Sequence, residues 1–389
     1  DLGPTEVEEL LVDAARRMAL ADPEQETTIA AAFQASYDQL TPDLQTCWRS
    51  LSIFPCDFDS AAASAVWGTQ DIDPGETLAK LRDAGLIDFV TGNHWQLHNL
   101  ARDFTQVVCS SAELDTLAYR HAVYFKGVLA ESNRLYQEGD ENICVGLNLF
   151  DRERQNIEAG QAWVAGHLGE TIAANLCNLY PDEGTYIISL RLHPRTQIIW
   201  LEAALTAART LGSWQYQGKH LGNLGNVWLT LGEPLRAIEY FEQQLGIVQN
   251  TGDRRCEGTS LGNLGQAYAI LKKPHQAIEY YEQALVIIRE IDDKRSEGSI
   301  LVNLGIAYKD LGKLHRAIEY YEQALLIIRE TGDKNAEGRT LDNLGSAYLY
   351  LVELEKAGRY YEQALTVARE IGDQQSEANA CWNLGCLLF

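Results

Sequence analysis

The chain has 389 residues, of which 22% are charged and 46% are apolar, and its formal net charge is −23. This composition is that of a soluble globular protein with room for two or three domains. No apolar run reaches the ~18 residues of a membrane span, and the acidic balance disfavours a nucleic-acid partner, which needs clustered Lys and Arg. We therefore expect no membrane binding and no nucleic-acid binding.

The start of the chain and its cysteines indicate where the protein works. The first residue is Asp1 rather than Met, and no apolar h-region follows it. We therefore expect a cytoplasmic piece of a longer chain rather than a secreted protein. The eight cysteines are scattered and form no C-x-x-C pair, so they are predicted to be reduced thiols, and a zinc site is disfavoured.

Residues 1–27 are predicted to form a helical segment, which is interrupted by Asp22-Pro23. A separate domain is expected over residues 28–110. Its helices show apolar residues at i, i+3 and i+4 spacing, and we expect them at residues 29–37, 42–54, 58–67 and 74–84.

Two short alternating runs follow these helices, at residues 86–90 and 94–97. The Thr91-Gly92-Asn93 turn between them predicts a β-hairpin, and helices followed by a hairpin indicate a winged helix. The helix before the hairpin carries Lys80 and Arg82 as its only cations, against two acidic residues. That balance is weak for a DNA groove, so the winged helix is not expected to bind DNA.

Residues 111–170 are predicted to form a helical linker, and residues 171–212 a degenerate repeat. The Trp200-Leu201-Glu202 run of this second segment aligns with the equivalent run of the repeats that follow. Its first helix is interrupted by Pro181 and Gly184, as expected of an irregular first repeat.

The rest of the chain, residues 213–389, is organised by the tripeptide Asn-Leu-Gly, which returns every forty residues. A fixed period of 20 to 50 residues is typical of stacked repeats. We expect four full repeats and a truncated last one, since Phe389 closes a first helix that no second helix follows. The asparagines of the five copies are Asn223, Asn263, Asn303, Asn343 and Asn383.

One repeat can be followed in full. Residues 254–271 are predicted to form helix A, and residues 274–290 helix B. Asp253 is expected to cap helix A. Gly265 lies inside helix A, where glycine costs roughly 1 kcal/mol against alanine. Because this glycine recurs in each repeat, we expect it to admit the close approach of helix B at Ala277.

This pattern resembles the tetratricopeptide repeat, in the forty-residue form of the kinesin light chain and Pins-type adaptors. The matching residues of one copy are Leu301, Leu304, Gly305 and Tyr308 in helix A and Ala317, Tyr321 and Ala324 in helix B. The resemblance covers residues 213–389. It implies a mainly α fold, in which a right-handed α-solenoid of tetratricopeptide repeats follows the winged-helix domain.

The resemblance also implies a protein or peptide partner in a groove lined by the A helices. One asparagine per repeat offers donors and an acceptor to an extended backbone, and such asparagines bind cargo backbones in kinesin light chain and Pins-type repeats. The expected peptide-binding residues are the five asparagines named above, with Lys219, Gln266, Lys309 and Arg339 as their groove neighbours. The alternative interpretation is that each asparagine bonds carbonyl groups of the neighbouring repeat.

A second resemblance covers the domain before the linker. Three segments resemble the winged-helix part of NB-ARC-type signalling NTPases, the STAND proteins: residues 31–55, 78–90 and 95–104. Leu97-His98-Asn99 falls on the Met-His-Asp motif of that family. The resemblance implies that His98 reaches the β-phosphate of bound ADP, although Asn99 stands where the family usually has Asp. Residues 149–164 resemble the segment that joins the winged helix to helical repeats in bacterial members.

No catalytic site and no metal site is expected in this chain. The phosphate-binding motif G-x-x-x-x-G-K-[ST] does not occur. The letters G-x-S-x-G occur at residues 258–262, but inside a predicted helix rather than in the strand–turn–helix setting of a nucleophile. We therefore predict that the chain is not an enzyme and needs no cofactor, whereas ATP or ADP is expected to bind the full-length protein.

These observations lead us to expect the sensor half of a bacterial STAND NTPase. The repeats would bind a peptide or protein signal, and the winged helix would relay it to a nucleotide-binding domain upstream of Asp1, with oligomerisation on activation. The alternative is a non-switching adaptor whose repeats scaffold other proteins. A phosphate-binding motif upstream of Asp1 would distinguish the two.

Overall fold

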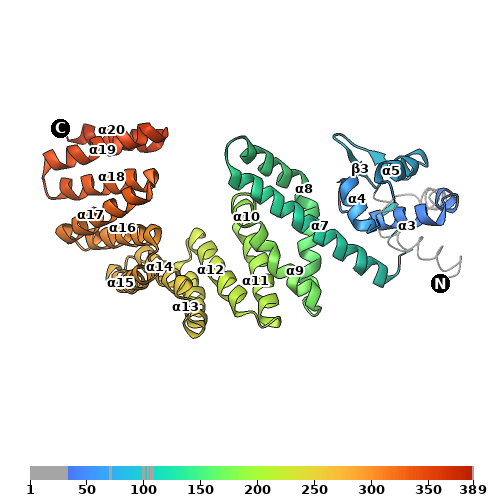
Figure 1. The fold of residues 1–389 in the computed structure, drawn as a ribbon, viewed down its shortest axis with the longest axis horizontal. Helices are drawn as coiled ribbons and strands as arrows, with labels where there is room; N and C mark the ends of the chain where they lie inside the picture. Colours follow the sequence, from blue (N-terminus) through green and yellow to red (C-terminus); the bar gives the residue numbers. More distant parts are fainter. Residues whose placement is uncertain (1–33, 70–71, 99–100, 103–104, 106–108, 388–389) are drawn as a thin grey trace, which may run out of the picture. The chain divides into compact units, whose positions relative to one another are not determined.

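The computed structural model describes residues 34–69, 72–98, 101–102, 105 and 109–387 (Figure 1). The chain divides into two compact units, Asp1–Ser213 and Trp214–Phe389. The expected helical segment 1–27 lies outside the described residues, as does Asn99. Of the helices that are described, none combines the length and apolar composition that crossing a membrane requires.

The first unit contains short helices and a small antiparallel sheet. Its helical elements are α3 (Pro42–Ser50), the 3-10 turn η1 (Leu51–Ile53), α4 (Ser60–Trp67) and α5 (Pro74–Asp83). Its strands are β1 (Phe58–Asp59), β2 (Asp88–Phe89) and β3 (His94–Gln96), in the order β1-β3-β2. Strands β2 and β3 form the expected hairpin, in which Phe89 pairs with Trp95.

Strand β1 corrects the sequence analysis, which assigned Phe58 to a helix. Phe58 pairs with Trp95, and Asp59 pairs with His94. Helix α4 starts only after Asp59, because the Asp59 carboxylate accepts a hydrogen bond from the Ala62 amide at 2.7 Å and is the N-cap. An N-cap residue has extended backbone, so the two residues before the helix are free to pair with β3.

Tryptophan side chains hold these elements together. Trp48 is fully buried, and its indole N–H donates to the Leu86 carbonyl oxygen at 3.3 Å, which ties α3 to the segment before the hairpin. Trp67 of α4 donates to the Cys47 carbonyl oxygen at 3.0 Å. Each indole is thus buried with its N–H satisfied, and the helices share one apolar core.

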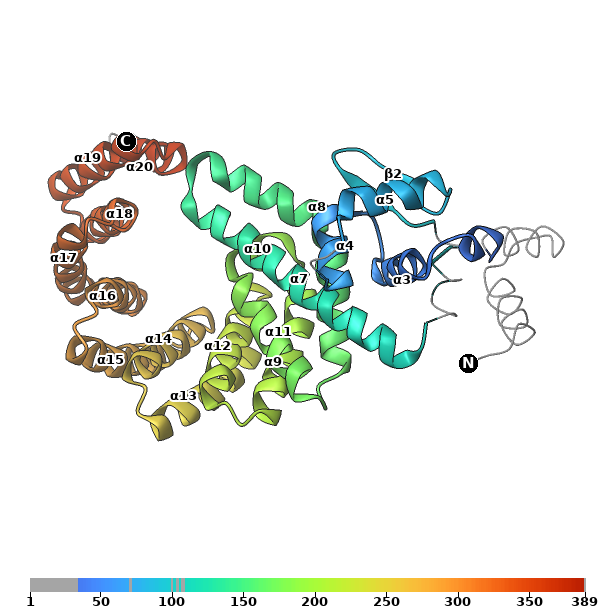
Figure 2. The ribbon, with the colours of Figure 1, turned by 45° about the vertical axis from the view of Figure 1, so that its right-hand side comes forward.

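Two long helices follow, and they lie side by side in Figures 1 and 2. They are α7 (Ser111–Glu138) and α8 (Asp140–Gly166), joined at Gly139, whose φ of 81° suits a residue without a Cβ. The Ser132 hydroxyl of α7 donates to the Gly146 carbonyl oxygen of α8 at 2.6 Å. The unit ends with α9 (Thr171–Glu183), α10 (Thr185–Arg191) and α11 (Pro194–Thr210), and Gly184 separates the first two.

The second unit is a series of helices that alternate as A and B. They are α12 (Trp214–Thr230), α13 (Pro234–Thr251), α14 (Arg254–Ile270), α15 (Pro274–Glu290), α16 (Lys294–Asp310), α17 (Leu314–Thr331), α18 (Lys334–Tyr350), α19 (Leu354–Ile371) and α20 (Gln374–Cys386). Consecutive helices pack against each other along the whole series. This confirms the mainly α fold and the α-solenoid that the forty-residue period predicts.

The glycine of the Asn-Leu-Gly tripeptide lies against an aromatic ring of helix B. A Cβ placed on Gly265 would come within 2.6 Å of the Tyr281 ring, which is buried. The close approach is therefore confirmed, but the nearest group is the Tyr281 ring, one turn after the expected Ala277. The equivalent pairs are Gly225 with Phe241, Gly305 with Tyr321 and Gly345 with Tyr361.

Buried glutamates tie A helices to the B helices that precede them. Glu297 of α16 accepts hydrogen bonds from Arg289 Nε at 2.7 Å and from Lys294 Nζ at 3.1 Å, and its side chain is 6% exposed. Burial alone would raise the pKa of Glu297, but the hydrogen bonds from the two cations outweigh it and lower the pKa. Glu337 of α18 repeats this arrangement.

Replacement of a glycine that lies against a helix B ring should destabilise the second unit. Gly265→Ala places a methyl group against the Tyr281 ring, and this overpacking is expected to cost about 1–3 kcal/mol. Gly246→Ala is the matched control, because Gly246 lies in α13 with nothing within 4 Å of an added Cβ. The control should be neutral or stabilising by about 0.5–1 kcal/mol. Denaturant unfolding measures both, and equal effects would contradict the importance of the ring contact.

Loss of the Glu297 charge should destabilise the protein in a pH-dependent way. Glu297→Gln is expected to cost about 1.5–3 kcal/mol at neutral pH, the value of hydrogen bonds to a charged group. Because the folded pKa is lowered from the unfolded value of about 4.3, the contribution is fully present above that value and is lost as the pH falls through the folded pKa. The unfolding free energies of the two proteins should therefore converge in acid.

Glu377→Gln is the control for this experiment. The Glu377 side chain is 37% exposed and pairs with Arg369, and Gln374 stands where a second cation, Lys294, stands beside Glu297. We expect a smaller loss, about 0–1 kcal/mol for an exposed pair. Two results would show that Glu297 does not stabilise the protein through its charge. One is a loss at Glu377 as large as that at Glu297, and the other is a difference in unfolding free energy between Glu297→Gln and the unmodified protein that persists in strong acid.

Candidate functional site

The asparagines expected to bind a ligand all lie on A helices. Figure 2 shows α14, α16 and α18 along the inner side of the arc that the second unit forms, with α15, α17 and α19 on its outer side. The five side chains are each half-buried: Asn223 on α12, Asn263 on α14, Asn303 on α16, Asn343 on α18 and Asn383 on α20. Among the described residues, the first four make no side-chain hydrogen bond.

Asn383 is bound within the chain. Its side-chain amide donates to the Asp342 carboxylate of α18, one A helix earlier, at 2.7 Å. The corresponding positions in the earlier repeats are Gly222, Gly262 and Val302, none of which carries a side-chain acceptor. Asn383 therefore follows the alternative interpretation, in which each asparagine bonds the neighbouring repeat. Its acceptor is a carboxylate instead of a backbone carbonyl.

The predicted groove neighbours lie on different repeats. Lys219 and Gln266 are exposed on α12 and α14, and Lys309 is half-buried on α16. Arg339 is exposed on α18, one helical turn before Asn343. The structure thus brings Arg339 and Asn343 together, whereas Lys219 and Gln266 belong to other repeats.

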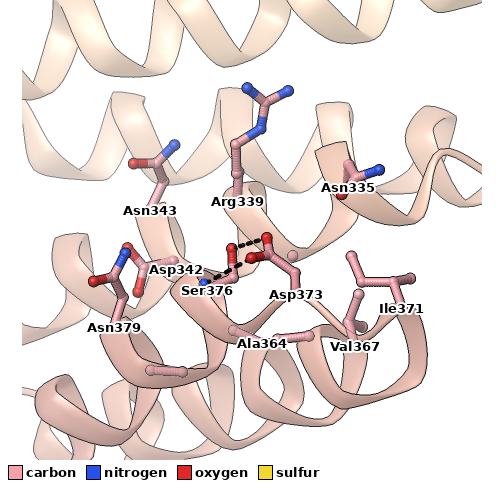
Figure 3. A pocket seen from close by; sticks show the side chains of 13 residues that line it. Asn335, Arg339, Asp342, Asn343, Ala364, Val367, Ile371, Asp373, Ser376 and Asn379 are labelled. Atoms are coloured by element: carbon pink, nitrogen blue, oxygen red, sulfur yellow. Dashed lines mark hydrogen bonds between the residues drawn. The ribbon is translucent and has the colours of Figure 1, made fainter. Parts of the chain in front are cut away.

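Arg339 and Asn343 line a pocket of about 530 Å³ between α18, α19 and α20 (Figure 3). Its apolar floor comes mainly from α19, through Ala364, Val367, Ala368 and Ile371. Ser376 and Asn379, which α20 contributes to the opposite wall, were not among the site residues predicted from the sequence. Asn379 precedes Asn383 by four residues, and Arg339 precedes Asn343 by the same number. This shared spacing would have predicted Asn379 as a site residue.

Two carboxylates of the pocket are occupied by contacts within the chain. Asp373 caps α20 and accepts hydrogen bonds from the Ser376 amide at 3.1 Å and the Ser376 hydroxyl at 2.6 Å (Figure 3), and these bonds lower the pKa of Asp373. Burial raises the pKa of Asp342, and the bond from Asn383 and the charge of Lys309 offset part of that effect. Arg339, by contrast, makes no ion pair and no hydrogen bond with any described residue.

His98, the residue expected to sense a nucleotide, is exposed just after strand β3. Its carbonyl oxygen accepts a hydrogen bond from the Arg102 amide at 2.9 Å. His98 therefore lies at the surface of the first unit, two residues after the end of β3.

A buried polar cluster joins the hairpin to α8, and the sequence analysis missed it. His94 Nε2 lies 3.1 Å from a carboxylate oxygen of Glu153, and His94 Nδ1 lies 3.1 Å from the Gly92 carbonyl oxygen. The two side chains are 5% and 6% exposed. Both ring nitrogens thus face oxygen atoms. Asn156 extends the cluster by donating to the Asp57 carbonyl oxygen at 2.9 Å.

A second buried histidine, His121 of α7, is a core residue. Burial lowers the pKa of His121 to about 4, partly offset by a hydrogen bond with Asn156, so the ring is neutral near pH 7. It packs against Phe54 and Phe125 as a core residue. The eight cysteines are free thiols. In the described part of the chain, no group of His, Cys, Asp and Glu is arranged to hold a metal ion.

Comparison with known families identifies the repeats. The family profile described as "Tetratricopeptide repeat" matches residues 216–290 and 296–370. These residues are tetratricopeptide repeats. They take in nearly all of α12 to α19, so four of the five asparagines and the α18 and α19 walls of the pocket belong to tetratricopeptide helices.

Solved structures that resemble this chain have low sequence identity to it. The STAND protein with a tetratricopeptide repeat sensor from Pyrococcus horikoshii is 18% identical over 98% of this chain, with a TM-score of 0.45, and this chain spans 62% of its length. A putative kinesin light chain from Podosopora anserina is 20% identical over 54% of this chain and 99% of its own, with a TM-score of 0.41. RapI in its apo form is 11% identical over 85% of this chain and 82% of its own, with a TM-score of 0.51, which shows a shared fold. No curated protein sequence matches the chain.

Removal of the buried carboxylate should loosen the hairpin from α8. Glu153→Ala leaves His94 buried without its partner and is expected to cost about 3–5 kcal/mol. Glu158→Ala is the control on the same helix, since Glu158 is 36% exposed and pairs with Arg154; it should cost about 0–1 kcal/mol. Unfolding followed by tryptophan fluorescence measures both, and losses of equal size would show that the pair does not hold the hairpin.

Proposed function

We propose that the tetratricopeptide repeats bind an extended segment of a partner protein on the side lined by the A helices. The observation that supports this proposal is that three asparagines, Asn263, Asn303 and Asn343, have unused hydrogen-bonding groups. Their side chains are half-buried, and they make no hydrogen bond among the described residues. A side-chain amide offers donors and an acceptor, which match the groups of a peptide backbone.

The spacing of the asparagines suits an extended ligand. Packed helices lie about 8–10 Å apart, and an extended chain advances roughly 3.3 Å per residue. One asparagine per repeat could therefore meet about every third peptide bond. The side chains between these bonds would contact a mixed surface that includes Lys309 and Arg339, so the partner segment is selected by its sequence as well as by its backbone.

We further propose that the first unit relays this binding to a nucleotide-binding domain, as in a bacterial STAND NTPase. Short helices followed by the β2–β3 hairpin have the order of a winged helix, and Leu97-His98-Asn99 falls on the Met-His-Asp motif. His98 is exposed, as contact with a nucleotide in another domain requires. The buried pair of His94 and Glu153 couples the strand that leads to His98 with α8. Partner binding must favour one of two domain arrangements, since equal affinity for both would shift neither.

In this proposal the present chain performs no catalytic step. ATP or ADP binds the preceding domain of the full-length cytoplasmic protein, which oligomerises on activation. A plain adaptor is the second candidate, because the repeats alone would suffice for it and they are the part matched by a family profile. The coding sequence upstream of Asp1 separates the two: a G-x-x-x-x-G-K-[ST] motif between a predicted strand and a predicted helix supports the switch, and its absence leaves the adaptor.

Loss of two asparagines should remove partner binding while the fold persists. Asn263→Ala combined with Asn303→Ala removes hydrogen bonds worth about 1 kcal/mol each, so affinity should fall about tenfold to a hundredfold. The measurement is capture of partners from cell extract, compared with the unmodified chain, together with the melting temperature of both proteins.

Asn383→Ala is the contrasting variant, because it breaks the bond to Asp342 inside the chain. It should lower the melting temperature with less effect on capture. If the double variant instead loses several degrees of stability, the asparagines are structural, and the proposed binding mode is wrong.

A further inference from the structure

The B helices differ at a position that faces the preceding A helix. Helices α15 and α17 carry Ile288 and Ile328 there, α13 carries Val248, and α19 carries Ala368, the smallest of the four. A Cβ placed on Gly258 would lie 2.8 Å from Ile288 Cδ1, and one placed on Gly298 would lie 3.1 Å from Ile328 Cγ1. The two isoleucines therefore fill the space beside these glycines.

Ala368 leaves the equivalent space open. A Cβ placed on Gly338 would have a single neighbour within 4 Å, Val367 Cγ1 at 3.5 Å. Val367 is itself shorter than Ile287 and Ile327, which occupy its position in the preceding repeats. Both of these shorter side chains, Val367 and Ala368, line the pocket of about 530 Å³.

The rim of this hollow carries a cation that the chain does not neutralise. Arg339 is exposed and makes no ion pair with the described residues. Arg329 and Arg369, on the flanking B helices, are each paired with a glutamate. In Figure 3 the Arg339 and Asn343 side chains point the same way from α18, at the mouth of the pocket. An exposed guanidinium without an ion pair is complementary to a carboxylate, which it can bind through two parallel hydrogen bonds.

We propose that the hollow formed by Gly338, Ala368 and Asn379 binds one bulky apolar side chain of the partner segment, while Arg339 binds a carboxylate on an adjacent residue of that segment. This inference rests on the proposed function, because it requires an extended segment along the A helices. The floor of Ala364, Val367, Ala368 and Ile371 suits an apolar side chain, because inserting that side chain removes apolar surface from water. The side-chain amides of Asn343 and Asn379 line the hollow and can donate hydrogen bonds to the backbone of the inserted segment, while Asn379 Oδ1 accepts one from Gln375 at 3.2 Å.

Three capped dipeptides test the chemistry of the hollow. The probes are acetyl-Glu-Phe-amide, acetyl-Glu-Ala-amide and acetyl-Lys-Phe-amide, titrated into the whole chain with labelled alanine methyl groups. The Glu-Phe probe should shift the methyl signals of Ala364, Ala368 and Ala380 in a saturable way. The other two should bind at least about tenfold more weakly, because each lacks either the buried ring or the carboxylate.

Ala368→Ile tests the location, since it restores the side chain of the preceding repeats. It should abolish the shifts of Ala364 and Ala380 without lowering the melting temperature, because filling a cavity generally stabilises a protein. Thr366→Leu is the matched control: it adds apolar bulk to α19 at an exposed position where the preceding repeat has Leu326. This control should bind the Glu-Phe probe with unchanged affinity. Arg339→Gln should remove the preference for Glu over Lys.

Two results would overturn the inference. One is unchanged affinity of the Glu-Phe probe for Ala368→Ile, and the other is no saturable methyl shift in the unmodified chain. The variant with Asn263→Ala and Asn303→Ala should bind the dipeptide normally, because both residues lie in other repeats. If that variant loses partner capture while the dipeptide fails to bind the unmodified chain, the proposed function stands and the hollow is rejected.

Discussion

The contact between a helix A glycine and a helix B ring fixes the geometry of the repeats. Because Gly265 has no side chain, the Tyr281 ring lies flat against the helix, and the same pairing recurs in the neighbouring repeats. Successive residues of an α-helix are turned by about 100°, so the asparagine two positions before the glycine points roughly 200° away from the ring. The packing contact thus determines which side of helix A the asparagines occupy.

Further contacts join one repeat to the next. Tyr308 stacks on Tyr320 and donates to Glu282 of the preceding helix B, and Glu297 is clamped by cations. These contacts use the buried side of helix A and the B helices. The position of Asp342 holds Gly, Gly, Val and Asp in successive repeats. It also faces neighbouring helices, because a Cβ on Gly262 would lie 3.0 Å from Ile300 Cδ1 and Asp342 itself accepts a hydrogen bond from Asn383.

The sequence predicts this unit well because its signals are local and repeated. Helix bounds such as Arg254–Ile270 follow from periodicity and from the cap at Asp253. The first unit is less predictable, because its strand β1 has only two residues. These residues are extended because Asp59 caps the next helix and Phe58 pairs with Trp95. His94 and Glu153 are 59 residues apart, and no spacing rule connects them. The break at Ala368 is visible in the sequence, but only the packing around Gly338 shows that it opens a hollow.

The way in which the hairpin is attached to α8 has a consequence for the proposed relay. Apolar contacts can be exchanged gradually as helices slide, whereas a buried pair such as His94 and Glu153 is strongly unfavourable once one partner is withdrawn. In the proposed relay the hairpin would therefore have one arrangement with the pair made and a distinct one with it broken, with intermediate positions disfavoured. Since His98 lies only four residues after His94, a shift of α8 that broke the pair would also release the segment that carries His98. A discrete change of this kind is what transmission from the repeats to a nucleotide site would need.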